Sequence, residues 1–191
     1  MKLFEMYSKS YENAKKIEEH LQIIFASIAT FKYKDINDNI DVYYKTISNI
    51  VSYLITLKKP NEGIPLLLNL LTIGSNNDPS ILNPVYSQFL RICIYSKSFM
   101  IAKGIIEKEY GFDVSLTGIE AKDILLFYYY SGYIALILHN YRLAYTNFRT
   151  ALLIPTDEPH LCQMQAAKKF SLVCCILDEV FLLESRIPIR I

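Results

Sequence analysis

The stretch KDILLFYYYSGYIALILHNYRLAYTNFRTALLIP, residues 122–155, decides the fold. It contains two apolar-rich segments that meet at His139 and Asn140, and these segments predict helices over about 121–139 and 141–153. Six residues follow the order of the tetratricopeptide (TPR) motif: an aromatic, a glycine, an alanine, a second aromatic, a second alanine and a proline. They are Tyr128, Gly132, Ala144, Phe148, Ala151 and Pro155. The order predicts an antiparallel helix pair.

The spacing of the motif has a packing reason. Ala144, Phe148 and Ala151 stand at positions i, i+4 and i+7, which places them on one stripe of the second helix. We expect Gly132 to lie where the two helices cross, near Ala144, because two large side chains there would force the helices apart. Phe148 would fill the space that the small residues leave. We therefore predict a structural, repeat-packing role for the six motif residues.

Helical periodicity continues along most of the chain. Apolar residues recur every three or four positions and predict further helices over about 11–31, 40–57, 62–73, 80–96, 99–110 and 160–183. We expect Asn61 to cap the helix 62–73, and Gly74 and Gly111 to close the helices that precede them. No segment alternates strongly with period 2. The sequence thus predicts an all-α, TPR-like right-handed α-solenoid of antiparallel pairs, with about eight helices.

The predicted helices group into three parts of the chain. We expect an N-terminal helical hairpin over 1–58, TPR-like repeats over 59–184 and a short tail over 185–191, where Pro188 disfavours helix. A repeat hairpin cannot bury its apolar stripe alone, so each pair needs neighbours.

Composition narrows the class of protein. The 191 residues are 52% hydrophobic and 20% charged, which predicts a folded chain and excludes a disordered one. The net charge of +1 argues against nucleic-acid binding. The tyrosine run 128–130 also lacks the basic residues of a base-stacking surface, since no Lys or Arg lies between Lys122 and Arg142. The uncharged stretch 124–141 has a clean apolar part of only about 15 residues, shorter than a bilayer span. We expect no signal peptide, no membrane and no nucleic-acid partner.

Catalytic and cofactor motifs do not occur in the sequence. There is no H-E-x-x-H, G-x-S-x-G, phosphate-binding or dinucleotide-binding pattern, so we expect no catalytic residue, cofactor, metal or small-molecule substrate. The cysteines lack C-x-x-C spacing and are expected to be free thiols in a reducing compartment. An enzymatic alternative stays open, in which His160, Cys162, Cys174 and Cys175 form a thiol or metal site. Zinc analysis would test it.

The residues around the tyrosine run resemble the family of COP9 signalosome subunit 3 proteins. The resemblance is carried by features that the family shares: Tyr128, Tyr129, Tyr130, Gly132, Asn140, Tyr141, Ala144, Ala151 and Pro155. It extends to KKPNEGIPLLLNLL (58–71), LRICIYSKSFMIA (90–102) and KKFSLVCCIL (168–177), and covers roughly 43–177. The TPR order is common to many unrelated proteins, whereas the tyrosine run with both flanks is more specific.

The resemblance implies a non-catalytic scaffold subunit in the cytoplasm and nucleus. Its partners would be the other signalosome subunits, in a complex that removes NEDD8 from cullin ligases and so regulates the ubiquitin pathway. Members of the family also carry a winged-helix PCI module, for which we expect no room here. Two alternatives remain: a stand-alone TPR adaptor that binds a peptide in its concave groove, and a subunit of the related proteasome-lid or initiation-factor assemblies.

Overall fold

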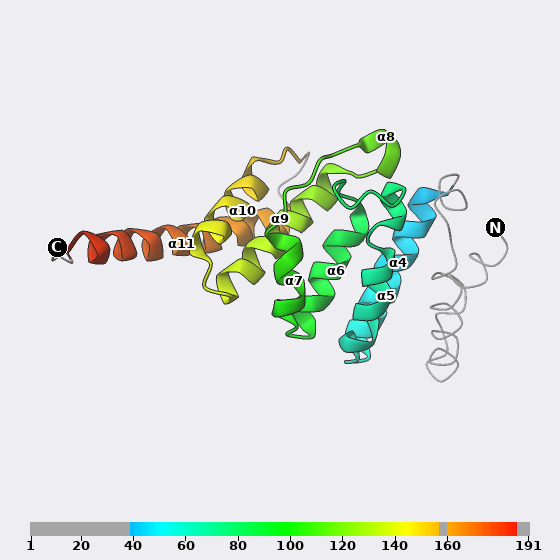
Figure 1. The fold of residues 1–191 in the computed structure, drawn as a ribbon, viewed down its shortest axis with the longest axis horizontal. Helices are drawn as coiled ribbons and strands as arrows, with labels where there is room; N and C mark the ends of the chain where they lie inside the picture. Colours follow the sequence, from blue (N-terminus) through cyan, green and yellow to red (C-terminus); the bar gives the residue numbers. More distant parts are fainter. Residues whose placement is uncertain (1–38, 157–159, 187–191) are drawn as a thin grey trace.

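The computed structural model of the chain describes residues 39–156 and 160–186, and this part is helical (Figure 1). It contains eight α-helices: α4 (Ile40–Thr56), α5 (Gly63–Leu70), α6 (Pro84–Tyr95), α7 (Phe99–Ile106), α8 (Val114–Thr117), α9 (Ala121–Ile137), α10 (Tyr141–Leu153) and α11 (Leu161–Arg186). Two 3₁₀ helices, η2 (Pro60–Glu62) and η3 (Ile73–Ser75), flank α5. The predicted all-α class is confirmed. The expected helix 11–31 and the residues 187–191 lie outside the described residues.

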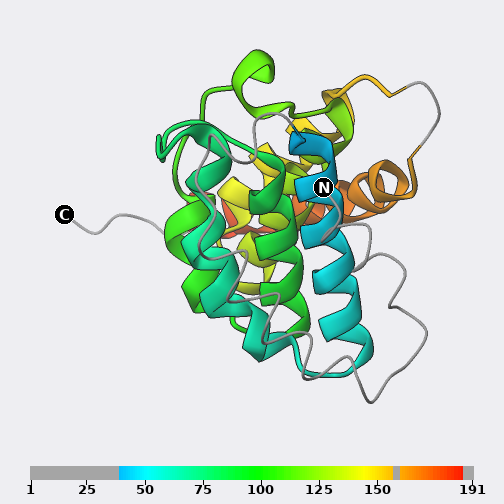
Figure 2. The ribbon, with the colours of Figure 1, turned by 90° about the vertical axis from the view of Figure 1, so that its right-hand side faces the viewer.

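The helices stack in the manner of a solenoid. The first helices of successive pairs form a row, in which α4 packs on α6, α6 on α9 and α9 on α11. Each second helix also reaches the next pair: α5 packs on α6, α7 on both α6 and α9, and α10 on both α9 and α11. Figures 1 and 2 show this layered order, with α11 extending beyond the last pair. The predicted helical-repeat architecture is therefore confirmed.

The core runs through the middle of this stack and is centred on α6. Almost every residue of α6 from Pro84 to Cys93 is buried, because neighbouring helices cover it on several sides. Phe89 of α6 and Phe148 of α10 are the largest side chains that are fully buried. No helix within the described residues is both long and apolar enough to cross a membrane.

The helix α6 begins at Pro84, four residues after the predicted start. Asn83 caps it: the side-chain oxygen accepts a hydrogen bond from the Val85 amide at 3.0 Å, and Pro84 suits the first helical position. The Asn83 amide also donates to the Leu71 carbonyl at 2.6 Å. Ser80 instead closes a turn with Asp78, whose carboxylate accepts from the Ser80 amide at 2.8 Å.

Two predicted caps of the third helix are wrong. Asn61 lies inside η2, which begins at Pro60, and it caps no helix. Gly74 lies inside η3 without a left-handed backbone, and the left-handed residues that follow are Asn76 and Asn77. Gly74 instead packs closely against Tyr44, since a β-carbon there would lie 2.6 Å from the Tyr44 hydroxyl oxygen.

The fifth helix also ends earlier than predicted. The helix α7 stops at Ile106, and Gly111 pairs with Ile81 in an isolated parallel bridge. The Leu82 amide donates to the Gly111 carbonyl at 3.0 Å, and the Gly111 amide donates to the Ser80 carbonyl at 2.8 Å. The short helix α8, capped by Asp113, was not predicted.

At the other end of the described chain, α11 continues to Arg186, two residues into the segment expected to be a tail. The division into 1–58, 59–184 and 185–191 remains a prediction.

Candidate functional site

The six motif residues lie on and after α9 and α10. A β-carbon placed on Gly132 of α9 would lie 2.8 Å from Cδ1 and from Cε1 of Phe148 on α10, so the phenyl ring is the closest side chain to this glycine. Ala144, Phe148 and Ala151 are fully buried. Tyr128 is half-buried against Phe127 at a ring-centroid distance of 5.3 Å, and Pro155 is exposed. The packing role of the six residues remains a prediction, tested below.

Tyrosines of α9 contact α11, the helix that follows the pair α9 and α10. Tyr129 and Tyr133 face Lys169 of α11, whose ammonium nitrogen lies 5.9 Å and 5.5 Å from the two ring centroids. This is cation–π geometry, and it joins α9 to α11. Tyr145 of α10 and Phe170 of α11 have ring centroids 5.0 Å apart. These contacts favour a structural role for the aromatic residues at the joint between successive repeats.

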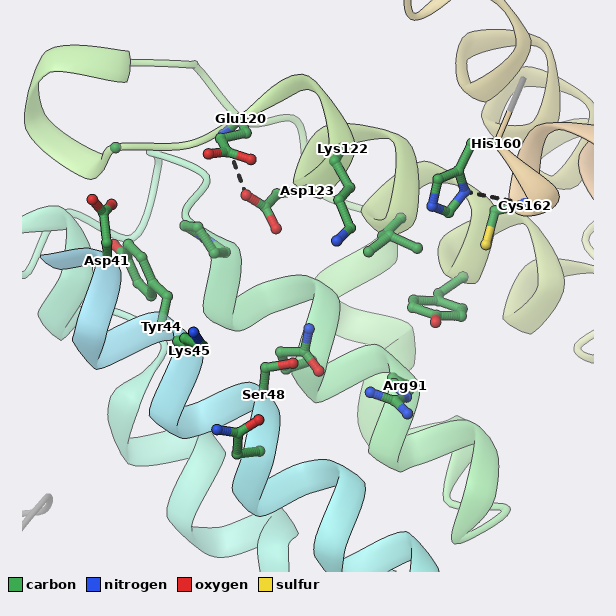
Figure 3. Close-up of a pocket in the computed structure, with 16 residues that line it drawn as sticks. Asp41, Tyr44, Lys45, Ser48, Arg91, Glu120, Lys122, Asp123, His160 and Cys162 are labelled. Atoms are coloured by element: carbon green, nitrogen blue, oxygen red, sulfur yellow. Dashed lines mark hydrogen bonds between the residues drawn. The ribbon is translucent and has the colours of Figure 1, made fainter. Parts of the chain in front are cut away.

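A groove of about 590 Å³ runs along the row of first helices (Figure 3). Residues of α4, α6 and α9 and the start of α11 line it. Its charged residues are the three cations Lys45, Arg91 and Lys122 and the three acids Asp41, Glu120 and Asp123. The groove is larger than a second pocket of about 330 Å³ that lies beside Lys58 and Tyr95.

The three acids of the groove lie at helix N-termini. Asp41 is in the first turn of α4, and Asp123 is in the first turn of α9, where its Oδ2 accepts a hydrogen bond from the Glu120 amide at 3.2 Å. Burial raises the pKa of the Asp123 carboxyl group, against the lowering effect of that hydrogen bond. The partial positive charge of a helix N-terminus stabilises such carboxylates.

The three cations come from three different helices. Arg91 of α6 donates a hydrogen bond from Nη1 to the Ser52 hydroxyl at 3.1 Å, while Lys45 and Lys122 are exposed. Among the residues that the structure describes, none of the three forms an ion pair. The groove therefore offers cationic donors that the described side chains leave available.

Two further polar groups line the same groove. Gln88 of α6 is only 9% exposed, and its side-chain oxygen has no hydrogen-bond partner among the described residues. Burial raises the pKa of the Tyr130 hydroxyl to about 12, and the nearby Arg91 guanidinium opposes this rise. Tyr130 is therefore a neutral hydroxyl at physiological pH.

The cysteines and His160 do not converge on a metal site in the described part of the chain. His160 Nδ1 accepts a hydrogen bond from the Cys162 amide at 3.2 Å, as expected of a residue at a helix start. No group of three or more His, Cys, Asp or Glu side chains within residues 39–156 and 160–178 is placed to hold a metal ion.

Comparison with known proteins identifies the family. The family model for the N-terminal helical repeats of COP9 signalosome complex subunit 3 matches residues 2–182. The chain belongs to this family. COP9 signalosome complex subunit 3 of Dictyostelium discoideum is 33% identical over 125 residues, which cover 64% of this chain and 30% of that relative. The match thus spans less than a third of that relative.

Sequence reasoning found the family but missed the groove cations. Lys45, Arg91 and Lys122 lie on separate helices and belong to no motif. The absence of Lys and Arg beside the tyrosine run is a local property only, because the fold brings Arg91 of α6 close enough to affect Tyr130. The one available signal was the position of each cation on the first helix of a predicted pair.

Proposed function

We propose that this chain is a non-catalytic scaffold subunit of a COP9 signalosome-like complex, acting with the other subunits in cullin deneddylation and ubiquitin-pathway regulation. The observation that carries this proposal is the match to the subunit 3 helical-repeat family over residues 2–182. The expected location, in the cytoplasm and nucleus, follows from the same proposal. We assign no catalytic residue, and no nucleic-acid, membrane or small-molecule partner.

The surface of the last helices supports a role in protein assembly. Leu153 of α10 and Leu161, Met164 and Leu172 of α11 are large apolar side chains with exposed fractions of 72%, 67%, 54% and 53%. Large apolar side chains exposed to this extent are typical of surfaces that another protein covers. We propose these four residues as contacts for a partner subunit.

Co-purification tests the proposal. The endogenous protein is tagged and recovered at physiological salt, and its partners are identified by mass spectrometry. We expect the other signalosome subunits together with cullins. The double variant Leu161→Ser, Met164→Ser should reduce their recovery. The matched control Met100→Ser, Ile101→Ser changes exposed apolar residues on α7 and should not. Recovery of no signalosome subunit by the folded wild-type protein would contradict the proposal.

A stand-alone adaptor is the second candidate function, because the polar groove along α4, α6 and α9 could hold a peptide. Recovery of a single unrelated protein in the same experiment would favour it. Recovery of proteasome-lid or initiation-factor subunits would instead favour one of the related assemblies.

A further inference from the structure

We propose that the groove along α4, α6 and α9 binds an extended acidic segment of a partner protein, with Arg91 and Lys122 holding side-chain carboxylates of Asp or Glu. Lys45, Gln88 and Tyr130 complete the set, and we call these five residues the basic wall. This inference deepens the proposed scaffold function and rests on it, since a partner protein supplies the segment.

The charge balance of the groove favours an anionic occupant. The three acids lie at the starts of α4 and α9, where helix N-termini favour carboxylates, although burial raises the pKa of the Asp123 carboxyl group. Arg91 lies on α6, which contributes no acid to the groove, and it forms no ion pair among the described residues. At Arg91 the groove therefore presents a positive charge that no acid of the same helix offsets.

The hydrogen-bonding capacity of the basic wall supports the same occupant. A guanidinium group has five N–H donors in a fork that matches a carboxylate. Arg91 uses one of them for Ser52 within the described part of the chain. Gln88, nine-tenths buried, leaves its side-chain oxygen without a partner there, and this oxygen can accept the backbone amide of a bound segment. Leaving such a group unpaired costs roughly 1–3 kcal/mol, so an occupant that pairs it gains affinity.

Two of the cations act on the Cys162 end of the groove. Burial raises the pKa of the Cys162 thiol at the start of α11, and Arg91 of α6 and Lys122 of α9 oppose this rise. Arg91 also acts on Tyr130. Figure 3 shows Arg91 on the side of His160 and Cys162 and Asp41 towards the other end, with Lys122 between them beside Asp123. A carboxylate bound between Arg91 and Lys122 would meet both cations.

The volume of the groove and the charges that line it favour a protein segment over other anions. A space of about 590 Å³ that touches four helices exceeds what a single small anion fills. Along the groove a nucleic acid would place phosphates beside the three acids as well as beside the cations, and those acids would repel it, whereas a peptide can place its carboxylates at the cations alone. A peptide presents separate carboxylates and a backbone that forms hydrogen bonds. Both suit a groove lined by charged side chains and by amide side chains such as Gln88.

Selection from random ten-residue peptides displayed on phage tests the inference with the full 191-residue chain. Fusion to the coat protein removes the free C-terminal carboxylate, so only side-chain carboxylates are offered. We expect Asp and Glu to be enriched in the selected peptides. In fluorescence anisotropy, a selected peptide should bind about tenfold more weakly after Asp→Asn or Glu→Gln exchange, equivalent to about 1.4 kcal/mol.

Variants of the chain complete the test. Lys122→Gln changes an exposed residue and should weaken binding of the selected peptide several-fold, and Arg91→Gln with Lys122→Gln should weaken it at least about tenfold. The matched control Lys103→Gln with Lys108→Gln removes the same charge from exposed positions on and after α7 and should leave binding within about twofold. Unchanged thermal melting confirms that each variant is folded.

The inference is overturned if acidic residues are not enriched, if Lys and Arg are enriched instead, or if the folded Lys122 and Arg91 variants bind as the wild type does. Its failure is separable from failure of the scaffold proposal. If Asp and Glu were not enriched in the selected peptides while signalosome subunits still co-purified, the groove inference alone would be rejected. Acidic selection without that co-purification would reject the signalosome assignment and leave an adaptor.

Discussion

Gly132 of α9 and Phe148 of α10 lie so close that the glycine has no room for a side chain. A β-carbon on Gly132 would stand 2.8 Å from two carbons of the Phe148 ring, and the ring itself is fully buried. The contact joins the two helices whose sequence decides the fold. It also explains why an intrinsically poor helix former occupies the middle of a 17-residue helix.

Substitution of Gly132 by alanine should therefore destabilise the protein. Alanine favours a helix interior by about 1 kcal/mol over glycine, but the clash with the Phe148 ring opposes this gain. Overpacking of a core costs roughly 1–3 kcal/mol, so we expect a net loss, which Gly132→Leu should increase. Urea unfolding followed by circular dichroism measures the change in the free energy of unfolding.

Gly104 provides the matched control. It lies in α7, and a β-carbon there would meet nothing within 4 Å. Gly104→Ala should stabilise the protein by about 0.5–1 kcal/mol, because only the helix preference acts. If Gly132→Ala stabilised the protein as Gly104→Ala should, the close packing of Gly132 would be refuted.

Phe148→Ala should be more costly than any change at Gly132. The substitution leaves a cavity beside α9 in place of a fully buried ring, and the loss expected for such a change is about 3–5 kcal/mol. The melting temperature should fall accordingly in differential scanning calorimetry. Phe112→Ala, at an exposed phenylalanine, is the control and should have little effect. Equal melting temperatures for the two variants would show that Phe148 is not part of the core.

Asn83 should contribute more to stability than other capping residues. It is 1% exposed, accepts from the Val85 amide and donates to the Leu71 carbonyl, so Asn83→Ala removes a cap and leaves buried backbone groups unpaired. We expect a loss of roughly 2–3 kcal/mol. Asn140→Ala removes the exposed cap of α10 and should cost about 1 kcal/mol. Urea unfolding compares the two, and an equal or smaller loss at Asn83 would contradict the assigned double role.

Asp123 should make the protein less stable as the pH rises. Burial raises the pKa of its carboxyl group above the ordinary value of 3.8, so the folded state favours the protonated form. Its contribution is complete below pH 3.8 and is lost as the pH rises through the raised pKa. Asp123→Asn, which can still accept the Glu120 amide, should lose less stability between pH 4 and pH 7 than the wild type. Parallel stability curves from urea unfolding would exclude this effect.

The four cysteines should differ sharply in reactivity. Burial raises the pKa of the Cys93 thiol to about 12, whereas Cys175 is exposed. Only the thiolate reacts, so Cys175 should react first with Ellman's reagent at pH 8 and Cys93 only on unfolding. Cys175→Ser should remove the fast phase. Loss of that phase in Cys93→Ser instead would place Cys93 at the surface.

Helix positions were predictable where caps and breakers agreed with periodicity. The predicted helix 141–153 matches α10 because Asn140 caps it and Pro155 follows it. The start of α6 was misplaced because periodicity began at Ser80, although the pair Asn83-Pro84 is the stronger start signal. Gly74 and Gly111 were misinterpreted as helix ends because sequence alone does not separate a glycine that ends a helix from one that permits close packing or backbone pairing.

The motif residues could be located from the sequence, whereas the groove could not. Gly132 and Phe148 are sixteen positions apart within one helix pair, so local spacing was enough to predict that their helices meet. Lys45, Arg91 and Lys122 are brought to one groove by the stacking of three pairs. That arrangement depends on how α4, α6 and α9 align, and helical periodicity does not fix the alignment between repeats.

The short backbone pairing of Ile81 with Gly111 has a consequence for how the molecule opens. It closes the α6–α7 hairpin at its open end, through hydrogen bonds that join residues before α6 to residues after α7. A ring of main chain closed in this way resists fraying from either end. Residues 80–111 should therefore exchange their amide protons with solvent as one cooperative unit, so that local unfolding of the chain is stepwise by unit rather than gradual along the stack.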